Sequence, residues 1–167
     1  MRLSSGEIVV KSSEKSELAE LDMLYGEAME FEGFDRLTPP ADPAKILRGG
    51  SSSVFPDEPL FDRCNCDLLS VYISGMLVGY VLLYRDFPGK RFVSVRTFYV
   101  AGAARGKGFG GRILEGLVKY FSAAEYGSLR ARVSPRNWDA LRFLAGRGFT
   151  HILSVQADGV IELERVL

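Results

Sequence analysis

The sequence is poor in residues that bind metals or form disulfides. Its 167 residues include 2 cysteines, Cys64 and Cys66, and 1 histidine, His151. The cysteines flank a single asparagine in a polar segment, whereas a structural zinc site needs about four sulfur or nitrogen ligands. We therefore expect no metal ion, and we interpret the cysteines as reduced thiols in a surface loop, as in proteins of reducing compartments.

Long apolar segments and an excess of charge of one sign are also lacking. The longest apolar run, Met76–Tyr84, is much shorter than the roughly 20 residues that span a bilayer, and no secretory signal pattern follows Arg2. Lys and Arg together number 21, as do Asp and Glu, so the net charge is zero. We expect a cytoplasmic protein that binds neither membrane nor nucleic acid, in which any anion site is local.

The sequence does contain a regular succession of strand-like and helix-like segments. Apolar residues recur at helical spacing from Leu18 to Ala28, with Ser12 or Ser13 as the expected N-cap. Three β-rich runs at 68–73, 77–84 and 92–100 predict an antiparallel meander. The other expected elements are a strand near Ile8–Val10, a short helix near 42–47, a helix over 113–121, a strand at Ser128–Val133, a helix capped by Ser134 or Asn137, and a strand pair around Asp158–Gly159. The length and this order are typical of one α/β domain, residues 1–167.

The segment ARGKGFGGRIL, residues 104–114, places four glycines between a strand and a helix. Unpaired amides at a helix start attract anions, and glycine lets a ligand approach the backbone. Gly106, Gly108 and Gly111 fit G-x-G-x-x-G, but a dinucleotide fold needs an early parallel β-α-β unit and a kinase loop needs a following strand. Neither context is present, and the spacing in Gly102–Lys107 is one residue too short for a Walker loop.

A different pair of motifs fits both the glycine turn and its context. Residues 105–110 match R-x-x-G-x-G, and Asn137, Ala140, Gly148 and Phe149 match N-x-x-A followed by G-F. On these motifs and on its element order, the chain resembles the GCN5-related N-acetyltransferase (GNAT) superfamily over almost its whole length.

The resemblance implies a mixed, mostly antiparallel central sheet of about six to seven strands with helices on both faces. This sheet is splayed between the strand that ends at Val100 and the strand Ser128–Val133. The pantetheine arm of acetyl-CoA would add to the open strand edge, and the glycine amides would wrap its diphosphate. The implied cofactor-binding residues are Phe98, Tyr99, Val100, Arg105, Gly106, Lys107, Gly108, Phe109, Gly110, Gly111 and Asn137. We expect Arg105 to face the phosphates and Phe109 to anchor the turn.

The implied reaction is direct attack of an amine on the thioester carbonyl, without an acyl-enzyme. The Val100 amide would polarise the carbonyl oxygen. Many family members protonate the departing thiolate with a tyrosine seven residues after the motif asparagine, where this sequence has Leu144. Tyr99, Tyr72, Ser134 or water would then take that role, although a thiol of pKa about 8.5 also leaves passably as thiolate.

The sequence gives two conflicting signals about the acceptor. Glu30 belongs to an acidic group with Glu27, Glu32 and Asp35, in a region that shapes the acceptor pocket in this family. That group either binds a cationic amine or is a solvated helix face. Arg96, in contrast, favours an acceptor that carries a carboxylate.

Two further side chains are notable for their rarity. Trp138, the single tryptophan, either fills the core or forms a wall of the acceptor tunnel. We interpret His151 as a half-buried structural residue of a C-terminal strand. The segment 93–100 contains no carboxylate, so the general base stays open together with the general acid.

These observations predict an acetyl-CoA-dependent N-acetyltransferase that acts on a primary amine of a small molecule or a peptide. Two alternatives stay open: a non-catalytic acyl-CoA-binding sensor, suggested by Leu144, and a protein-acetylating member of a complex. The resemblance also leaves open a homodimer and the use of a longer acyl group.

Overall fold

The computed structural model describes residues 1–32, 34–35, 37–49, 65–86 and 91–167. Within these residues the strands form one sheet in the order β1-β2-β3-β4-β5-β6-β8-β7. The strands are β1 Arg2–Ser5, β2 Ile8–Ser12, β3 Cys66–Ile73, β4 Met76–Arg85, β5 Phe92–Val100, β6 Ser128–Val133, β7 His151–Val155 and β8 Ile161–Val166. The helices are α1 Leu18–Glu30, α2 Pro43–Leu47, α3 Phe109–Ala123 and α4 Trp138–Ala145, with 3-10 turns η1 Lys15–Glu17 and η3 Gly102–Ala104.

The sheet is antiparallel except where β5 runs parallel to β6, so the prediction of a mixed, mostly antiparallel sheet is confirmed. It has 8 strands rather than six to seven, because β1 was not predicted. β1 has the sequence RLSS with mostly exposed side chains, and it therefore lacks the apolar alternation that marks a strand. It pairs with β2 through a two-residue turn in which Gly6 has φ +60°.

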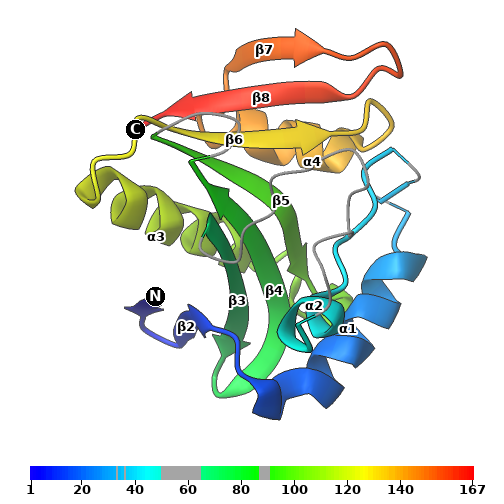
Figure 1. Cartoon of the computed structure of the whole chain (residues 1–167), viewed down its shortest axis with the longest axis vertical. Helices are drawn as coiled ribbons and strands as arrows, with labels where there is room; N and C mark the ends of the chain where they lie inside the picture. The colour runs from blue at the N-terminus through cyan, green and yellow to red at the C-terminus, as the bar shows by residue number, and fades with distance from the viewer. Residues whose placement is uncertain (33, 36, 50–64, 87–90) are drawn as a thin grey trace.

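Helices cover both faces of the sheet, as predicted (Figure 1). On one face, Leu21, Leu24 and Ala28 of α1 pack against tyrosines and leucines of β3, β4 and β5. On the other face, the apolar stripe of α3 packs with Leu144 of α4 against valines and isoleucines of the sheet. Phe98 and Val100 belong to this second cluster, whereas Tyr99 belongs to the first. Successive residues at the end of β5 therefore serve opposite faces.

The N-terminal cap of the first helix differs from the prediction. Neither Ser12 nor Ser13 caps it; Glu14 and Glu17 form a capping box at η1, which leads directly into α1. The Ser13 hydroxyl instead lies 2.7 Å from the hydroxyl of Ser70. Glu17 has the Glu/Gln role of a capping box, and a second glutamate replaces the usual Ser or Thr.

The cysteine prediction requires correction at Cys66, while Cys64 lies outside the described residues. Cys66 is a free thiol that begins β3 and is half-buried, so it does not belong to a surface loop. Burial raises the pKa of its thiol to about 11. Among the described residues, no helix has the length and apolar character needed to cross a membrane.

Candidate active site at the splayed strands

The gap between β5 and β6 begins at a β-bulge. The parallel ladder pairs Phe92–Val95 with Ser128–Ala131 and then stops, although β5 continues to Val100. On the other side of β5, the register with β4 skips Arg96. A bulge bends its strand and increases the local twist, so β5 diverges from β6 immediately after the bulge. The predicted splay is thus present, and the bulge accounts for it.

The backbone of Val100 faces this gap. The Ala101 amide donates to the Val78 carbonyl of β4 at 2.8 Å, and successive residues of a strand direct their backbone groups to opposite sides. The Val100 carbonyl accepts a hydrogen bond from Arg105 Nε at 2.7 Å. Because the N–H and the carbonyl of one strand residue share a side, the Val100 N–H is also directed into the gap.

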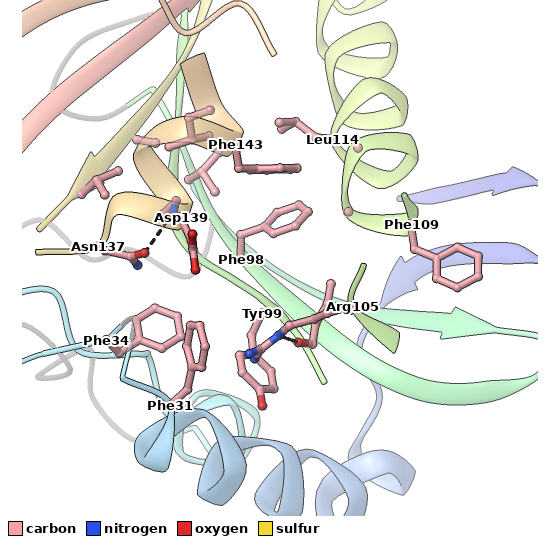
Figure 2. Close-up of a pocket in the computed structure, with 18 of the residues that line it drawn as sticks. Phe31, Phe34, Phe98, Tyr99, Arg105, Phe109, Leu114, Asn137, Asp139 and Phe143 are labelled. Atoms are coloured by element: carbon pink, nitrogen blue, oxygen red, sulfur yellow. Dashed lines mark hydrogen bonds between the residues drawn. The ribbon is translucent and has the colours of Figure 1, made fainter. Parts of the chain in front are cut away.

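The gap opens into a cavity of about 500 Å³ at the ends of β5 and β6. Its wall combines the end of α1 and the following loop, the glycine turn, and the start of α4 (Figure 2). Eleven of the predicted site residues line it: Arg96, Phe98, Tyr99, Val100, Arg105, Gly106, Gly108, Phe109, Gly110, Gly111 and Asn137. Four predicted site residues are not part of the lining: Glu30, Lys107, Ser134 and Trp138.

The glycine turn presents backbone amides to the cavity. Gly106 and Gly108 have φ values of +74° and +78°, and a Cβ at either position would have no neighbour within 4 Å. Gly108 is the N-cap of α3, and the first hydrogen bond of this helix runs from Arg112 N to Gly108 O. Among the described residues, the amides of Phe109–Gly111 have no acceptor, as expected for a helix start. The turn is therefore suited to binding an anion.

Gly111 has a packing role in addition. The guanidinium of Arg147 lies against Gly111, so a Cβ at this position would require the exposed, flexible Arg147 side chain to move. Lys107 is exposed, and its ammonium donates to the Ala103 carbonyl at 3.0 Å. Its side chain therefore turns back onto η3, outside the cavity lining.

The side chain of Arg105 does not follow the expected direction toward the glycine turn. Its guanidinium lies 3.8 Å from the ring centroid of Phe31 and 5.1 Å from that of Tyr99. Figure 2 shows it reaching toward these two rings, on the α1 side of the cavity. The hydrogen bond to Val100 and the stacking on Phe31 together fix this orientation.

The carboxylates of the acidic group, Glu27, Glu30, Glu32 and Asp35, do not converge on one site. The Asp35 carboxylate accepts hydrogen bonds from the Ser134 hydroxyl and from the amides of Leu37 and Thr38. Burial alone would raise the pKa of Asp35, but these hydrogen bonds outweigh it and hold the pKa below its usual range. Ser134, predicted as a catalytic candidate, is fully buried and occupied by this contact.

Neither glutamate of α1 that was expected near the acceptor lines the cavity. Glu27 Oε1 accepts a hydrogen bond from the Gly102 amide at 2.8 Å, which ties α1 to η3. Glu30 is exposed. A solvated helix face is therefore the better description of Glu30.

Tyr99 lines the cavity with its ring and directs its hydroxyl toward α1 (Figure 2). The hydroxyl is buried and makes no hydrogen bond of standard geometry with the described residues. Burial, with the Glu27 carboxylate nearby, raises the pKa of Tyr99 above its usual range. Leu144, at the position where a tyrosine was expected, is buried and lines the cavity from α4.

Two expectations about rare side chains are wrong. Trp138, the first residue of α4, is 71% exposed, so it does not fill the core, and it is not part of the cavity lining. His151 is also exposed, and its Nδ1 lies 4.0 Å from the Glu164 carboxylate. The Asn137 side chain caps α4 by accepting from the Ala140 amide at 3.0 Å, as predicted for one of the two candidates.

Sequence reasoning missed the aromatic wall. Phe31 and Phe34 line the cavity and meet edge to face, with ring centroids 6.1 Å apart. On the opposite side, Phe98 and Phe143 have ring centroids 6.0 Å apart. The only available signal for Phe31 and Phe34 was an aromatic pair after the last helical residue of α1, in a region otherwise rich in charge.

These features define the class of protein, an acetyl-CoA-dependent N-acetyltransferase, and comparisons with known proteins agree. The model of the acetyltransferase (GNAT) family matches residues 34–149, more than half of the chain. The chain belongs to this family. No curated protein matches the sequence significantly.

Solved structures share the fold at low identity. A GNAT-family acetyltransferase from Staphylococcus aureus Mu50 is 16% identical over 96% of this chain and 99% of its own, with a TM-score of 0.67. PaiA N-acetyltransferase from Thermoplasma acidophilum, solved with coenzyme A, is 14% identical over 96% and 99%, with a TM-score of 0.68. An acetyltransferase from Salmonella typhimurium that modifies the N-terminal serine of a 50S ribosomal subunit protein is 10% identical over 100% and 99%, with a TM-score of 0.74.

Proposed function

We propose that this chain transfers an acetyl group from acetyl-CoA directly to a primary amine of a small molecule or a peptide. The observation that carries the proposal is that the free amides of the glycine turn and the unpaired end of β5 border the same cavity. A site that holds both substrates side by side favours direct transfer, because the reacting atoms are positioned before reaction.

The residues around the cavity fit coenzyme A. The amides of Phe109–Gly111 are suited to a diphosphate, and the open space beside Gly106 and Gly108 leaves room for it. Among the described residues, the backbone of β5 beyond Val95 has no strand partner on the β6 side, so the amide groups of a pantetheine arm would pair with it as an added strand. Asn137 borders the same space at the start of α4.

The chemistry requires little from ionisable side chains. The amine nitrogen attacks the thioester carbonyl carbon, a C–N bond forms, the C–S bond breaks, and the sulfur leaves as thiolate while the nitrogen loses a proton to water. The Val100 N–H, directed into the gap, donates to the carbonyl oxygen as negative charge develops on it. Cys66 is unsuited to carry the acyl group, because its pKa of about 11 keeps the thiol protonated.

The leaving thiolate departs without a protein acid in this proposal. Leu144 supplies only hydrocarbon, the Ser134 hydroxyl is bonded to Asp35, and the Tyr99 hydroxyl lies on the α1 side of the sheet. A thiol with a pKa of about 8.5 is a tolerable leaving group as thiolate. The lack of a proton donor therefore raises the activation free energy less for a thiolate leaving group than it would for an alkoxide.

The proposal is tested by following free thiol release from acetyl-CoA with a panel of primary amines, alongside calorimetric binding of coenzyme A. We expect binding of coenzyme A and amine-dependent thiol release. Binding without release for any amine would favour the sensor alternative, which the Leu144 substitution makes worth testing. Absence of coenzyme A binding would overturn both.

A further inference from the structure

The charged side chains that line the cavity are mostly cationic. They are Arg96, Arg105, Arg132 and Asp139. Of these, Arg105 makes no ion pair with a carboxylate of the described residues, and its charge disfavours an acceptor with several positive charges, since like charges in a partly enclosed cavity repel strongly. The lining therefore suits an acceptor that brings negative charge with its amine.

Arg105 is the best positioned of these cations. Its Nε donates to the Val100 carbonyl at 2.7 Å, and its face stacks on Phe31 at 3.8 Å. Stacking uses the face of the guanidinium and leaves the in-plane N–H groups available. No carboxylate of the described residues forms an ion pair with Arg105, and the Tyr99 side chain is its neighbour besides Phe31, so its Nη groups can still donate to a carboxylate of a ligand. The fork of these groups matches the two oxygens of a carboxylate.

The carboxylates of the acidic group around α1, which would attract a cationic acceptor, are already hydrogen-bonded or lie outside the cavity lining, and Asp139 is the one carboxylate of the described residues in that lining. The Asp35 carboxylate accepts a hydrogen bond from the Ser134 hydroxyl, and the Glu27 carboxylate accepts one from the Gly102 amide. Glu30 and Glu32 are exposed and do not line the cavity. The acidic group seen in the sequence therefore does not form a binding site for a polyamine.

The position of the fork also limits where the negative charge lies on the acceptor. Arg105 donates a hydrogen bond to the carbonyl of Val100. The N–H of the same residue is directed toward the thioester in the proposed reaction. A carboxylate held by Arg105 is therefore close to the reacting nitrogen, and an α-amino acid places these two groups on one carbon. The Phe31 and Phe34 rings offer an apolar surface beside it for a side chain.

We propose, on the basis of the function proposed above, that the acceptor is a free α-amino acid with an apolar or aromatic side chain. Arg105 binds its carboxylate, and Phe31 and Phe34 contact its side chain. A peptide N-terminus lacks a carboxylate next to its amine, and a polyamine lacks one altogether. Both are therefore poor acceptors.

The experiment compares four probes by free thiol release with acetyl-CoA. They are phenylalanine, phenylalanine amide, phenylethylamine and spermidine. We expect kcat/KM for phenylalanine to exceed that for phenylethylamine and for the amide by roughly 10- to 100-fold, the effect of a charge-assisted hydrogen-bonded pair. Spermidine or the amide as the preferred acceptor overturns the inference while leaving the acetyltransferase proposal intact.

Variants of Arg105 distinguish binding of the acceptor carboxylate from a purely structural role of this side chain. Arg105→Gln should lower kcat/KM for phenylalanine by roughly 10- to 100-fold, mainly through KM, and lower that for phenylethylamine by far less. Arg105→Lys should recover part of the loss, because it keeps the charge without the fork. The matched control is Arg142→Gln, at an exposed position of α4 outside the cavity lining, which should leave both values unchanged.

The outcomes remain interpretable if Arg105 also supports the fold. An equal loss of kcat/KM for phenylalanine and phenylethylamine would mean that Arg105 only positions Val100, and it would overturn carboxylate recognition. Binding of coenzyme A, measured by calorimetry on the same variants, reports separately on the proposed function.

Discussion

The hydroxyl of Ser134, at the end of β6, donates a hydrogen bond to the carboxylate of Asp35, in the loop after α1. The same hydroxyl accepts from the Arg136 amide at 3.3 Å. This contact joins two sides of the cavity, because Phe34 and Thr38 of the Asp35 loop line it and β6 forms its far edge. Ser134 thus links the loop after α1, which contains Asp35, to the end of β6.

Replacing Ser134 by alanine tests this role. We expect Ser134→Ala to lower the free energy of unfolding by about 1–3 kcal/mol, since a hydrogen bond to a charged group is lost. In the enzymatic assay, KM for the amine should rise while kcat changes little. Urea denaturation and steady-state kinetics measure the two effects.

The control for this variant is Ser154→Ala, which removes a similar hydroxyl–carboxylate contact, to Glu162, on the outer strands. It should leave KM unchanged. A large fall in kcat for Ser134→Ala at constant KM would instead assign Ser134 the proton-donor role that the sequence left open.

Gly108, the N-cap of α3, adopts a left-handed backbone conformation with φ +78° and has open space around it. A β-branched residue is strained at such a φ by about 1–3 kcal/mol, and the turn would shift to relieve it. We therefore expect Gly108→Val to weaken coenzyme A binding by roughly tenfold or more. Calorimetry measures the dissociation constant.

Gly75 provides the matched control for this substitution. It has φ +83° and equally open surroundings, but it lies in the turn between β3 and β4. Gly75→Val should cost similar stability and leave the affinity for coenzyme A unchanged. Equal loss of affinity in both variants would show that general destabilisation, and not the glycine turn, determines binding.

Gly79 of β4 is paired with Val100 at the end of β5. A Cβ at this position would be 2.2 Å from the Tyr99 carbonyl oxygen, a contact that requires backbone movement. We expect Gly79→Ala to destabilise the fold by at least about 2 kcal/mol, in the range of severe overpacking. Gly26→Ala in α1, where no atom lies within 4 Å, should instead stabilise by about 0.5–1 kcal/mol. Chemical denaturation compares the two, and equal stability of the two variants would contradict the close approach of β4 and β5.

Glu17 is a buried carboxylate, 6% exposed, that holds α1 to the sheet. Burial alone would raise its pKa, but hydrogen bonds from Tyr72, Ser70, the Glu14 amide and Lys11 outweigh this and lower the pKa from 4.5 to about 2. A folded-state pKa below the unfolded one stabilises the protein above pH 4.5, and this contribution is lost as the pH falls toward 2.

The substitution Glu17→Gln tests this pH dependence. At neutral pH it should destabilise by about 1–3 kcal/mol, and the difference from the unmodified chain should shrink between pH 4.5 and about 2. Thermal unfolding across this pH range measures the effect. Glu30→Gln, at an exposed position, should change stability by less than about 0.5 kcal/mol at any pH. A pH-independent loss for Glu17→Gln would attribute the effect to packing alone.

The elements around the site were predictable because each has a local signal. Runs rich in β-branched and aromatic residues mark β3, β4 and β5, and the glycines and Asn137 mark the starts of α3 and α4. The glycine turn and its position at a helix start followed from the same local rules. β1 was missed because three of its four residues are exposed, which leaves no apolar alternation, and because it pairs only with β2 among the described residues.

The details of the acceptor side were not predictable, because they depend on contacts between distant segments. The direction of Arg105 is set by Phe31, which belongs to the end of α1. The Ser134 hydroxyl is engaged by Asp35, which lies 99 residues earlier in the loop after α1. Trp138 looked suited to a core or a tunnel by its residue type, yet its position in the first turn of α4 directs it to solvent.

Leu144 provides the last test, because it occupies the place of the tyrosine that many family members use as an acid. Leu144→Tyr should destabilise by about 1–3 kcal/mol, since Leu144 is packed in the core cluster and the larger ring must be accommodated. If the thiolate leaves unassisted, the new hydroxyl should raise kcat by less than about tenfold. Leu144→Phe is the control for ring size without a hydroxyl. A gain of 10²- to 10⁴-fold for tyrosine over phenylalanine, the usual range for general acid catalysis, would show that protonation of the leaving group limits the present enzyme and would contradict departure as free thiolate.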